Sequence, residues 1–420
     1  MTSIRVDTLE PLPGREEPPR RHVPPGRWLR ENLFSTWYNS VLTVLFAALL
    51  GLLLYRVGRF VFVDGRWEII ERNLRLLLVF RFPDDALWRL WTAMYVLAGT
   101  FGLAAGAAAT VRRAEVAAGR ARPIGGRFLP LRRVAPVVVL AAVLLWLAGS
   151  VGATLLVAGA AAVAVLGRLA GTLLPRRYAK WTAVLALVGL AAAFGIVIGL
   201  GGVSPRTWGG LLLTIYLAIG GIAISFPLGV LLALGRRSSL PAVRVVCVTY
   251  IEIIRGVPLI TVLFVGYLII GFTLPPGTPT PSVVTRAMIG IILFTAAYVA
   301  EIVRGGLQSV PRGQYEAAQA LGLSPVKTTW LIVLPQALRA VIPAMVGQFI
   351  SLFKDTSLVF IIGLTELLGV ADLITKQREF TAQGLIFETL LFVSLLYWVG
   401  SYSMSRESQR LERRLGVGER

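Results

Sequence analysis

The chain has 420 residues, of which 56% are hydrophobic and 15% charged, and its formal net charge is +20. Several apolar runs approach the ~20 residues that a helix needs to cross a bilayer, which indicates a polytopic helical membrane protein. A transmembrane barrel would show short alternating strands instead. The Lys and Arg residues lie mainly between the apolar runs, so membrane topology explains the positive charge better than nucleic-acid binding does.

Several kinds of chemistry are excluded by residue counts. The chain has one cysteine, Cys247, and one histidine, His22, which rules out an internal disulfide and argues against a Cys/His metal site or a Ser-His-Asp centre. No Lys follows a Gly, whereas a phosphate-cradling P-loop needs Gly-Lys before Ser or Thr. We therefore expect no metal, no cofactor and no enzymatic activity here, and any use of ATP would fall to another subunit.

The first part of the chain predicts a disordered tail at residues 1–37, rich in Pro, Arg and Glu, whose segment 28–35 is compatible with a short interfacial helix. This tail has no apolar core segment, so no cleavable signal is expected. Ten spans then follow in order, at residues 40–63, 90–111, two within 134–166, 181–200, 208–234, 257–272, 283–303, 340–364 and 384–404. The amphipathic segment 64–89 is expected to lie against the outer surface.

The run 134–166 is split into a hairpin because one straight helix of 33 residues would be ~50 Å long, too long for a ~30 Å hydrocarbon core. Gly149–Gly152 lies near its middle, and both flanks are rich in Arg. Whether the run is one span or a hairpin stays open from sequence alone. Gly102 with Gly106, and Gly195 with Gly199, have the small-x3-small spacing that allows close helix packing.

Four regions result: a cytoplasmic tail at 1–37, a membrane region of about five spans at 38–204, a five-span core at 205–405 that contains a polar loop at 311–337, and a basic cytoplasmic tail at 406–420. Charge supports this topology, because the proposed inner segments hold 30 Lys and Arg, the outer segments 9 and the spans 3. The bias places both termini and the polar loop in the cytoplasm.

The polar loop predicts two short helices with a sharp bend between them. The first is expected from about Arg312 to Leu321, with Gly322 just past its end in a left-handed conformation. Ser324 suits an N-cap and Pro325 the first position of the second helix. Pro335 is expected to end or kink that helix.

Ionisable residues within the spans are the other candidate sites. A polar cluster in the middle of the ninth predicted span, with two residues about one turn before it, suggests the lining of a solute pathway; the alternative is a structural ion pair. Its members are Gln348, Ser351, Lys354, Asp355, Thr356 and Ser357. Two structural ion pairs are also predicted, between Glu301 and Arg304 and between Glu252 and Arg255.

The loop also carries a specific motif. Glu316-Ala317-Ala318, three residues, Gly322, nine residues and then Ile332-Val333-Leu334-Pro335 resembles the EAA loop of ABC importer permeases, with every position filled. Three further stretches, beginning at Arg255, Ala297 and Lys354, resemble the R-G-x-P-L, A-Y-x-A-E-x-x-R-G-G and K-D-T-S-L motifs of the polar amino-acid family. The lead-in to the first span resembles the general L-amino-acid branch.

The resemblance implies an all-α fold with an ABC-importer-type permease core in the second half, in a bacterial inner membrane. It implies a second permease subunit, as an identical or sister chain, cytoplasmic ATPase subunits and an extracytoplasmic amino-acid-binding protein as partners. The residues that would couple to the ATPase are Glu316, Ala317, Ala318, Gly322, Leu334 and Pro335. Small residues would let the ATPase approach closely, and Glu316 would offer it a carboxylate.

The main alternative is a self-sufficient secondary transporter or channel for a small polar solute. Such a protein would need coupling groups in several spans, and inverted repeats would be common. A non-transporting membrane scaffold would leave Lys354 and Asp355 unexplained. Neither the transported amino acids nor the role of the first five spans follows from the sequence.

Overall fold

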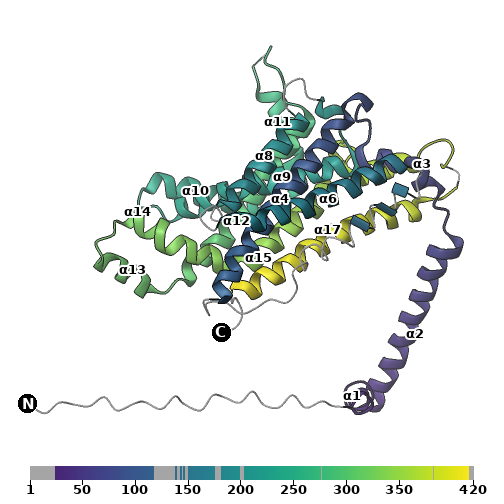
Figure 1. Cartoon of the computed structure of the whole chain (residues 1–420), viewed down its shortest axis with the longest axis horizontal. Coiled ribbons are helices and arrows are strands. Elements are labelled where there is room, and N and C mark those ends of the chain that lie inside the picture. Colours follow the sequence, from purple (N-terminus) through teal and green to yellow (C-terminus); the bar gives the residue numbers. More distant parts are fainter. Residues whose placement is uncertain are drawn as a thin grey trace, which may run out of the picture. The chain divides into compact units, whose positions relative to one another are not determined.

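The computed structural model describes residues 24–117, 138–139, 142–143, 145–146, 150–175, 181–198, 203–275, 277–381 and 383–415. Throughout these residues the regular structure is helical, apart from one isolated bridge between Gly210 and Glu366. The helices are α1 (Pro25–Asn32), α2 (Trp37–Arg59), η1 (Phe60–Asp64), α3 (Glu68–Val79), η2 (Asp84–Ala86), α4 (Leu87–Ala117), α6 (Val151–Leu173), α8 (Thr182–Ile198), η3 (Pro205–Thr207), α9 (Gly210–Arg236), α10 (Pro241–Gly256), α11 (Leu259–Thr273), α12 (Val283–Ser309), α13 (Arg312–Ala320), α14 (Pro325–Lys327), η4 (Thr328–Val333), α15 (Leu334–Asp355), η5 (Thr356–Ile362), α16 (Leu367–Thr375) and α17 (Ile386–Leu415) (Figure 1).

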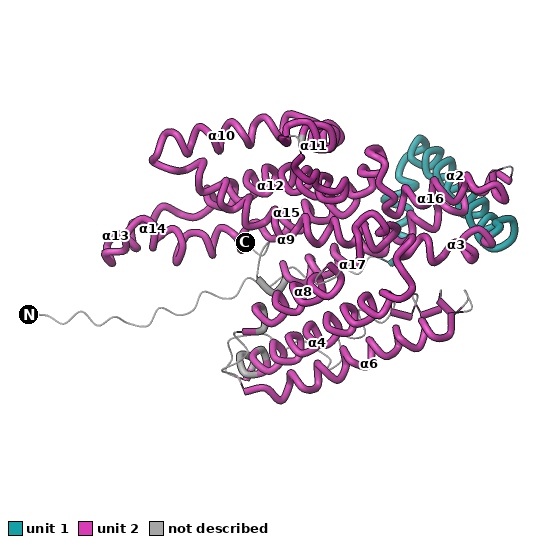
Figure 2. The backbone as a smooth tube through the Cα atoms, turned by 90° about the horizontal axis from the view of Figure 1, so that it is seen from above, with its two compact units in different colours: residues 1–66 teal, residues 67–420 magenta. Residues whose placement is uncertain are grey.

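Residues 1–66 form one compact unit and residues 67–420 a second (Figure 2). In the first unit, α1 lies within the predicted tail, begins at Pro25 directly after Pro24, and overlaps the short helix anticipated at 28–35. The tail before residue 24 lies outside the described residues. α2 and η1 match the first predicted span, and Thr36 caps α2 by accepting a hydrogen bond from the backbone N–H of Asn39.

Three helices of the second unit, α4, α6 and α8, form a bundle in which α4 packs against both others (Figure 2). The two glycines of α4 allow the close helix packing that their spacing predicts. A Cβ at Gly102 would lie 2.4 Å from the carbonyl oxygen of Ala164, and a Cβ at Gly106 would lie 2.1 Å from the carbonyl oxygen of Arg168. A Cβ at Gly195 would meet nothing within 4 Å, so Gly195 does not pack against another described helix. Gly199 lies outside the described residues.

The core of the second unit consists of α9, α12, α15 and α17, with α10 and α11 beside α12. Its largest apolar cluster joins α9, α12 and the region around Leu352. α10 and α11 meet at an angle of 111°, because Pro258 follows the end of α10 and caps α11. α11 has only 15 residues, and such a helix is ~22 Å long, short of a typical hydrocarbon core.

The amphipathic segment after the first unit packs onto the core. α3 contacts α9, α16 and α17 and buries Ile69, Leu74 and Leu77 in one apolar cluster with Val370 and other residues of α16 and α17. The side-chain amide of Gln377 donates to the Asn73 side chain at 2.9 Å, more than 300 positions away in the chain. α3 is therefore an integral part of one end of the core.

Seven helices in the described part of the chain are long and apolar enough to cross a membrane, or eight if the bent pair α10 and α11 is one span. α8 is a shorter apolar helix. In the run 134–166, the described structure shows α6 beginning at Val151 after Ser150, at the predicted break. Most of the predicted first arm lies outside the described residues. The prediction of an all-α, polytopic membrane protein with about ten spans is therefore consistent with the structure.

Candidate functional site

The bent loop at 311–337 has the local structure that its residue types predict. α13 begins at Arg312, and Gly322 follows it with a φ of +72°. Ser324 caps α14 by accepting from the backbone N–H of Lys327, and Pro325 is at the first helical turn. The predictions for these residues are confirmed because each depends only on neighbours within a few positions.

Of the two outcomes expected at Pro335, an end or a kink of the second helix, the structure excludes the end. α14 continues as the π-helix η4 and then as α15, which includes Pro335 in its first turn. A proline in a continuous helix removes a hydrogen bond and clashes with the preceding turn, and a π segment is a common local adjustment at such a point. The predicted second short helix is therefore the start of the long helix that leads into the core.

Burial separates the loop residues into two groups. Glu316, Ala317 and Gly322 are exposed, whereas Ala318 and Leu334 are buried against the rest of the chain. Ala318 and Leu334 therefore pack against the core, and Ala318 does not present the open surface expected of a small residue at this position. The exposed surface also includes large apolar side chains at unspecified positions of the motif, namely Leu321 at 79%, Val326 at 67%, Leu331 at 64% and Trp330 at 50% exposure.

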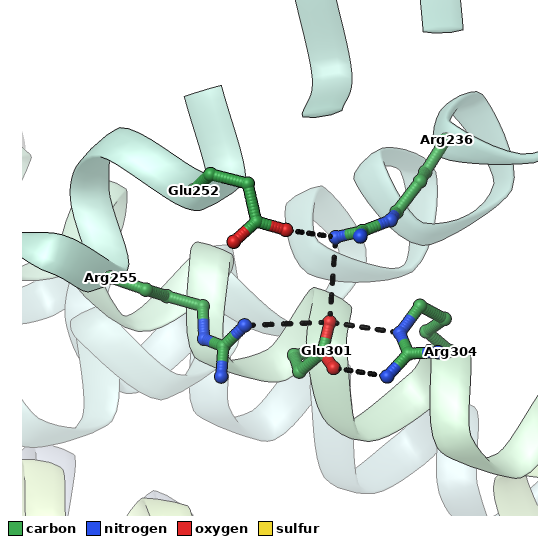
Figure 3. A network of polar contacts seen from close by, with 5 residues as sticks. All are labelled: Arg236, Glu252, Arg255, Glu301 and Arg304. Atoms are coloured by element: carbon green, nitrogen blue, oxygen red, sulfur yellow. Dashed lines mark hydrogen bonds and ion pairs between the residues drawn. The ribbon is translucent and has the colours of Figure 1, made fainter. Parts of the chain in front are cut away.

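A charged junction lies at the same end of the core and consists of Arg236, Glu252, Arg255, Glu301 and Arg304 (Figure 3). Glu301 accepts from Arg304 Nε at 2.9 Å, which confirms the predicted pair. Its Oε2 also lies 3.5 Å from Arg236 and 3.6 Å from Arg255. One carboxylate of α12 thus holds guanidinium groups from α9, α10 and its own helix.

The other predicted pair has different partners. Glu252 pairs with Arg236 of α9 at 2.8 Å, and Arg255 pairs with Glu301 of α12. Helical spacing alone puts Glu252 and Arg255 near each other, but the neighbouring helices bring opposite charges to each side of α10. The prediction of a local Glu252–Arg255 pair is therefore wrong, and both residues instead join separate helices.

The polar cluster around Asp355 lies about halfway along the core helices. A Cβ at Gly221, near the middle of α9, would lie 3.2 Å from the Leu352 side chain, and the rings of Phe353 and Tyr397 of α17 pack 5.4 Å apart at a tilt of 55°. The ninth predicted span is borne out by the candidate membrane span Pro325–Ile362. Within it, α15 ends at Asp355 and the 3₁₀-helix η5 follows. A helix interrupted at mid-depth is a common feature of solute sites in transporters.

The members of this cluster differ in accessibility. Lys354 is exposed, and Gln348, Ser351 and Ser357 are half-buried. Ser351 Oγ donates to the carboxylate of Asp355 at 3.3 Å. Thr356 is fully buried, and its hydroxyl donates to the carbonyl oxygen of Phe353 at 2.7 Å, so it closes the end of α15 and does not line a pathway in this structure.

The sequence reasoning missed Glu366, which is fully buried at the other end of the core. Its carboxylate accepts hydrogen bonds from Tyr397 at 2.8 Å, from the Gly369 backbone N–H at 2.9 Å and from Thr214 at 3.3 Å. Burial raises the pKa of this carboxyl, and these hydrogen bonds oppose the shift. The sequence signal for this buried site was a single acidic residue before the apolar run of α16. The same residue also fits an ordinary N-cap, so the signal does not point to a buried site alone.

No cluster of His, Cys, Asp and Glu that could hold a metal ion occurs among the residues that the structure describes. The candidate sites are therefore surfaces and polar linings: the bent loop, the charged junction beside it and the cluster around Asp355. The first two lie at the C-terminal end of α9, and α3 and Glu366 lie near its N-terminal end (Figure 1). α9 has 27 residues, so these ends are ~40 Å apart.

Comparison with known proteins gives these sites a context. Residues 225–417 match the family model "binding-protein-dependent transport system inner membrane component". The inner membrane amino-acid ABC transporter permease protein YhdY of Escherichia coli is 35% identical over 93% of both chains. The glutamate/glutamine/aspartate/asparagine transport system permease protein BztC of Rhodobacter capsulatus is 35% identical over 98% of both chains.

Shorter relatives match about half of the chain. The probable glutamine ABC transporter permease protein GlnP of Bacillus subtilis is 38% identical over 49% of this chain and 91% of its own. A solved structure described as an amino acid ABC transporter with histidines is 32% identical over 49% of this chain and 92% of that one, with a TM-score of 0.44. The full-length likeness to YhdY and BztC shows that the chain belongs to the binding-protein-dependent transport system inner membrane components, as a permease of the polar amino-acid ABC importers.

Proposed function

We propose that this permease receives its driving force from a separate ATPase subunit that docks on the bent loop at 311–337. The observation that carries the proposal is the division within the loop. Its exposed part presents Glu316, Ala317, Leu321 and Gly322, while its buried residues fix it to α12 and α15. A partner that pushes on such a loop moves the spans on either side of it.

The exposed surface is chemically suited to a protein partner. Leu321, Val326 and Glu316 are all exposed on this loop, and exposed apolar side chains together with a charged one are typical of a docking surface. Gly322 offers no side chain, so a partner can approach the backbone there. The excess of Lys and Arg in the proposed inner segments supports placing this loop, and both termini, in the cytoplasm.

The cluster around Asp355 is proposed as part of the translocation pathway. Asp355 and Ser351 lie where α15 changes to η5, and Ser351 donates to the Asp355 carboxylate. Amino acids are zwitterions, so a carboxylate, an ammonium group and hydroxyls within the span are suitable partners. Gln348, Lys354 and Ser357 complete the accessible members of the cluster.

The proposed partners are the ATPase, a second permease, identical or related, and an extracytoplasmic binding protein that delivers the solute. The relatives are named for amino-acid transport, and BztC for glutamate, glutamine, aspartate and asparagine, which favours polar or general L-amino acids as substrates. In this arrangement α3 and α16 lie on the outer side, because they pack at the opposite end of α9 from the loop.

Co-purification tests the docking. The permease complex is isolated in mild detergent with the wild-type chain, with Glu316→Arg and with Glu71→Arg, an exposed acid of α3 at the other end of the core. We expect the ATPase to remain with the wild type and with Glu71→Arg and to be lost with Glu316→Arg. Retention in all three variants would contradict a role for Glu316. Uptake by this chain alone in ATP-free vesicles would favour a secondary transporter.

A further inference from the structure

Two consecutive arginines at the end of α9 contact different parts of the α13 end of the core. Arg237 Nη1 donates to the Tyr315 hydroxyl of α13 at 3.3 Å and to the Leu307 carbonyl oxygen of α12 at 3.4 Å. Its guanidinium carbon lies 6.0 Å from the centre of the Tyr315 ring. Arg237 therefore connects α9, the last turns of α12 and the first helix of the bent loop.

Arg236 makes the complementary set of contacts. Its Nη1 lies 2.8 Å from Glu252 Oε1 and 3.5 Å from Glu301 Oε2 (Figure 3). The two arginines thus connect the charged junction to the loop. Arg236 forms ion pairs with α10 and α12, and Arg237 donates a hydrogen bond to α13. Both are at the C-terminal end of α9, where the partial negative charge of the helix favours cations.

The covalent chain leaves a gap that these contacts bridge. α13 follows α12 and precedes α14, so motion of the loop passes directly to those two helices. α9 and α10 precede α12 in the chain and have no direct covalent connection to α13. A displacement of α13 reaches them only through noncovalent contacts, and Arg237 supplies polar ones.

We propose that Arg237 is a positioning residue that transmits the movement of α13 to α9, and through Arg236 and the charged junction to α10. The inference rests on the proposed docking of an ATPase on the loop and names the route by which that docking reaches helices outside the loop's own connections. The proposed role needs no contact between Arg237 and solute or nucleotide. That role is to make α9 and α10 move together with α12 and α15 when α13 is displaced.

The Arg237 contacts are weak enough that the fold does not depend on them, yet strong enough to couple the movement of two helices. The Arg237 contacts are long, at 3.3 and 3.4 Å, and Arg237 is exposed to solvent, so they contribute little to stability. Coupling energies between sites are typically ~1–3 kcal/mol, or ~5–150-fold in an equilibrium. Loss of Arg237 can therefore remove the coupling while the core, held by its apolar clusters, stays folded.

The experiment measures solute uptake and ATP hydrolysis by the complete transporter in proteoliposomes. The variants are Arg237→Gln, Arg237→Lys and Tyr315→Phe, with Arg244→Gln, an exposed arginine of α10, as the matched control. We expect Arg237→Gln to lower the solute taken up per ATP hydrolysed by ~5-fold or more. Tyr315→Phe should act in the same direction but less, because the ring contact stays.

Arg237→Lys separates charge from geometry, since lysine keeps the charge and loses the planar donor fork. We expect partial coupling in this variant and normal coupling in Arg244→Gln. Thermal unfolding of each purified complex reports whether a variant is folded, and Tyr315→Phe provides the test if Arg237→Gln is not. Unchanged uptake per ATP in folded Arg237→Gln, with the ATPase bound, would overturn the inference alone. Failure of the wild-type chain to retain any ATPase would refute the proposed function and the inference with it.

Discussion

Gly322 gives the sharpest test of the bent loop, because its conformation has one physical cause. Its φ is +72°, and a Cβ built there would meet nothing within 4 Å. Substitution in the isolated chain therefore costs backbone strain without a steric clash. A left-handed conformation costs an ordinary L-residue ~1–2 kcal/mol, and asparagine tolerates it better. Proline fixes φ near −65°, so it cannot keep this turn.

Gly322→Pro has a second effect, because the Gly322 N–H donates to the carbonyl oxygen of Gln319 at 2.9 Å and proline has no N–H. We expect Gly322→Pro to abolish ATP-driven uptake while membrane insertion remains. Gly322→Ala should lower the population of the native turn by ~5- to 30-fold, since each 1.4 kcal/mol corresponds to a factor of ten. Gly313→Ala is the control, because Gly313 lies in α13 without a positive φ and with free space around it.

Uptake and ATPase retention are measured for Gly322→Asn, Gly322→Ala and Gly322→Pro. If backbone conformation decides the effect, activity falls in that order. If close approach of the ATPase decides it, alanine does better than asparagine, because it is smaller. Normal uptake and coupling in Gly322→Pro would refute the reasoning that this turn shapes the docking loop.

Three further predictions concern other parts of the chain. Asp355→Asn should lower uptake with little change in thermal stability if Asp355 lines the pathway, and a large loss of stability with normal specific uptake would favour a structural role. Gly106→Ala should destabilise the complex by ~1–3 kcal/mol, measured as a lower melting temperature, because its Cβ would lie 2.1 Å from a carbonyl oxygen of α6; Gly195→Ala, with open space, should not. Leu77→Ala should cost ~2–5 kcal/mol, since Leu77 is fully buried in the cluster shared by α3, α16 and α17, and an unchanged melting temperature would contradict the packing of α3 on the core.

What the sequence predicted well is what depends on local chemistry. The start of α13, the turn at Gly322 and the cap at Ser324 follow from residues within a few positions of one another. The positions of the long apolar helices follow equally from hydropathy. The motif around Glu316 indicated the family of ABC importer permeases, and the full-length relatives confirm that family.

What the sequence could not predict depends on residues that are distant in the chain. Glu252 is paired by Arg236 of another helix, and spacing within α10 carries no information about that neighbour. Glu366 is held by Thr214 and Tyr397, 152 and 31 positions away. The π segment before Pro335 is a backbone adjustment with no clear residue signature. Burial of Ala318, whose small size suits an exposed contact equally well, is likewise decided by tertiary packing.

The charged junction shows how these two kinds of information combine. Glu301 and Arg304 were predictable from their spacing, yet the junction has three guanidinium groups around Glu301 only because α9, α10 and α12 end together. Its position beside Arg237 and α13 connects the sequence motif to the rest of the core.

The central claim is that the bent loop faces the compartment that holds ATP, and cysteine labelling tests it most directly. In a Cys247→Ser background, Gln319→Cys places a single thiol on the exposed part of α13 and Glu71→Cys places one on α3. A membrane-impermeant maleimide should label Gln319→Cys only in inside-out vesicles and Glu71→Cys only in right-side-out vesicles. Labelling of Gln319→Cys only from the extracytoplasmic side would contradict the account.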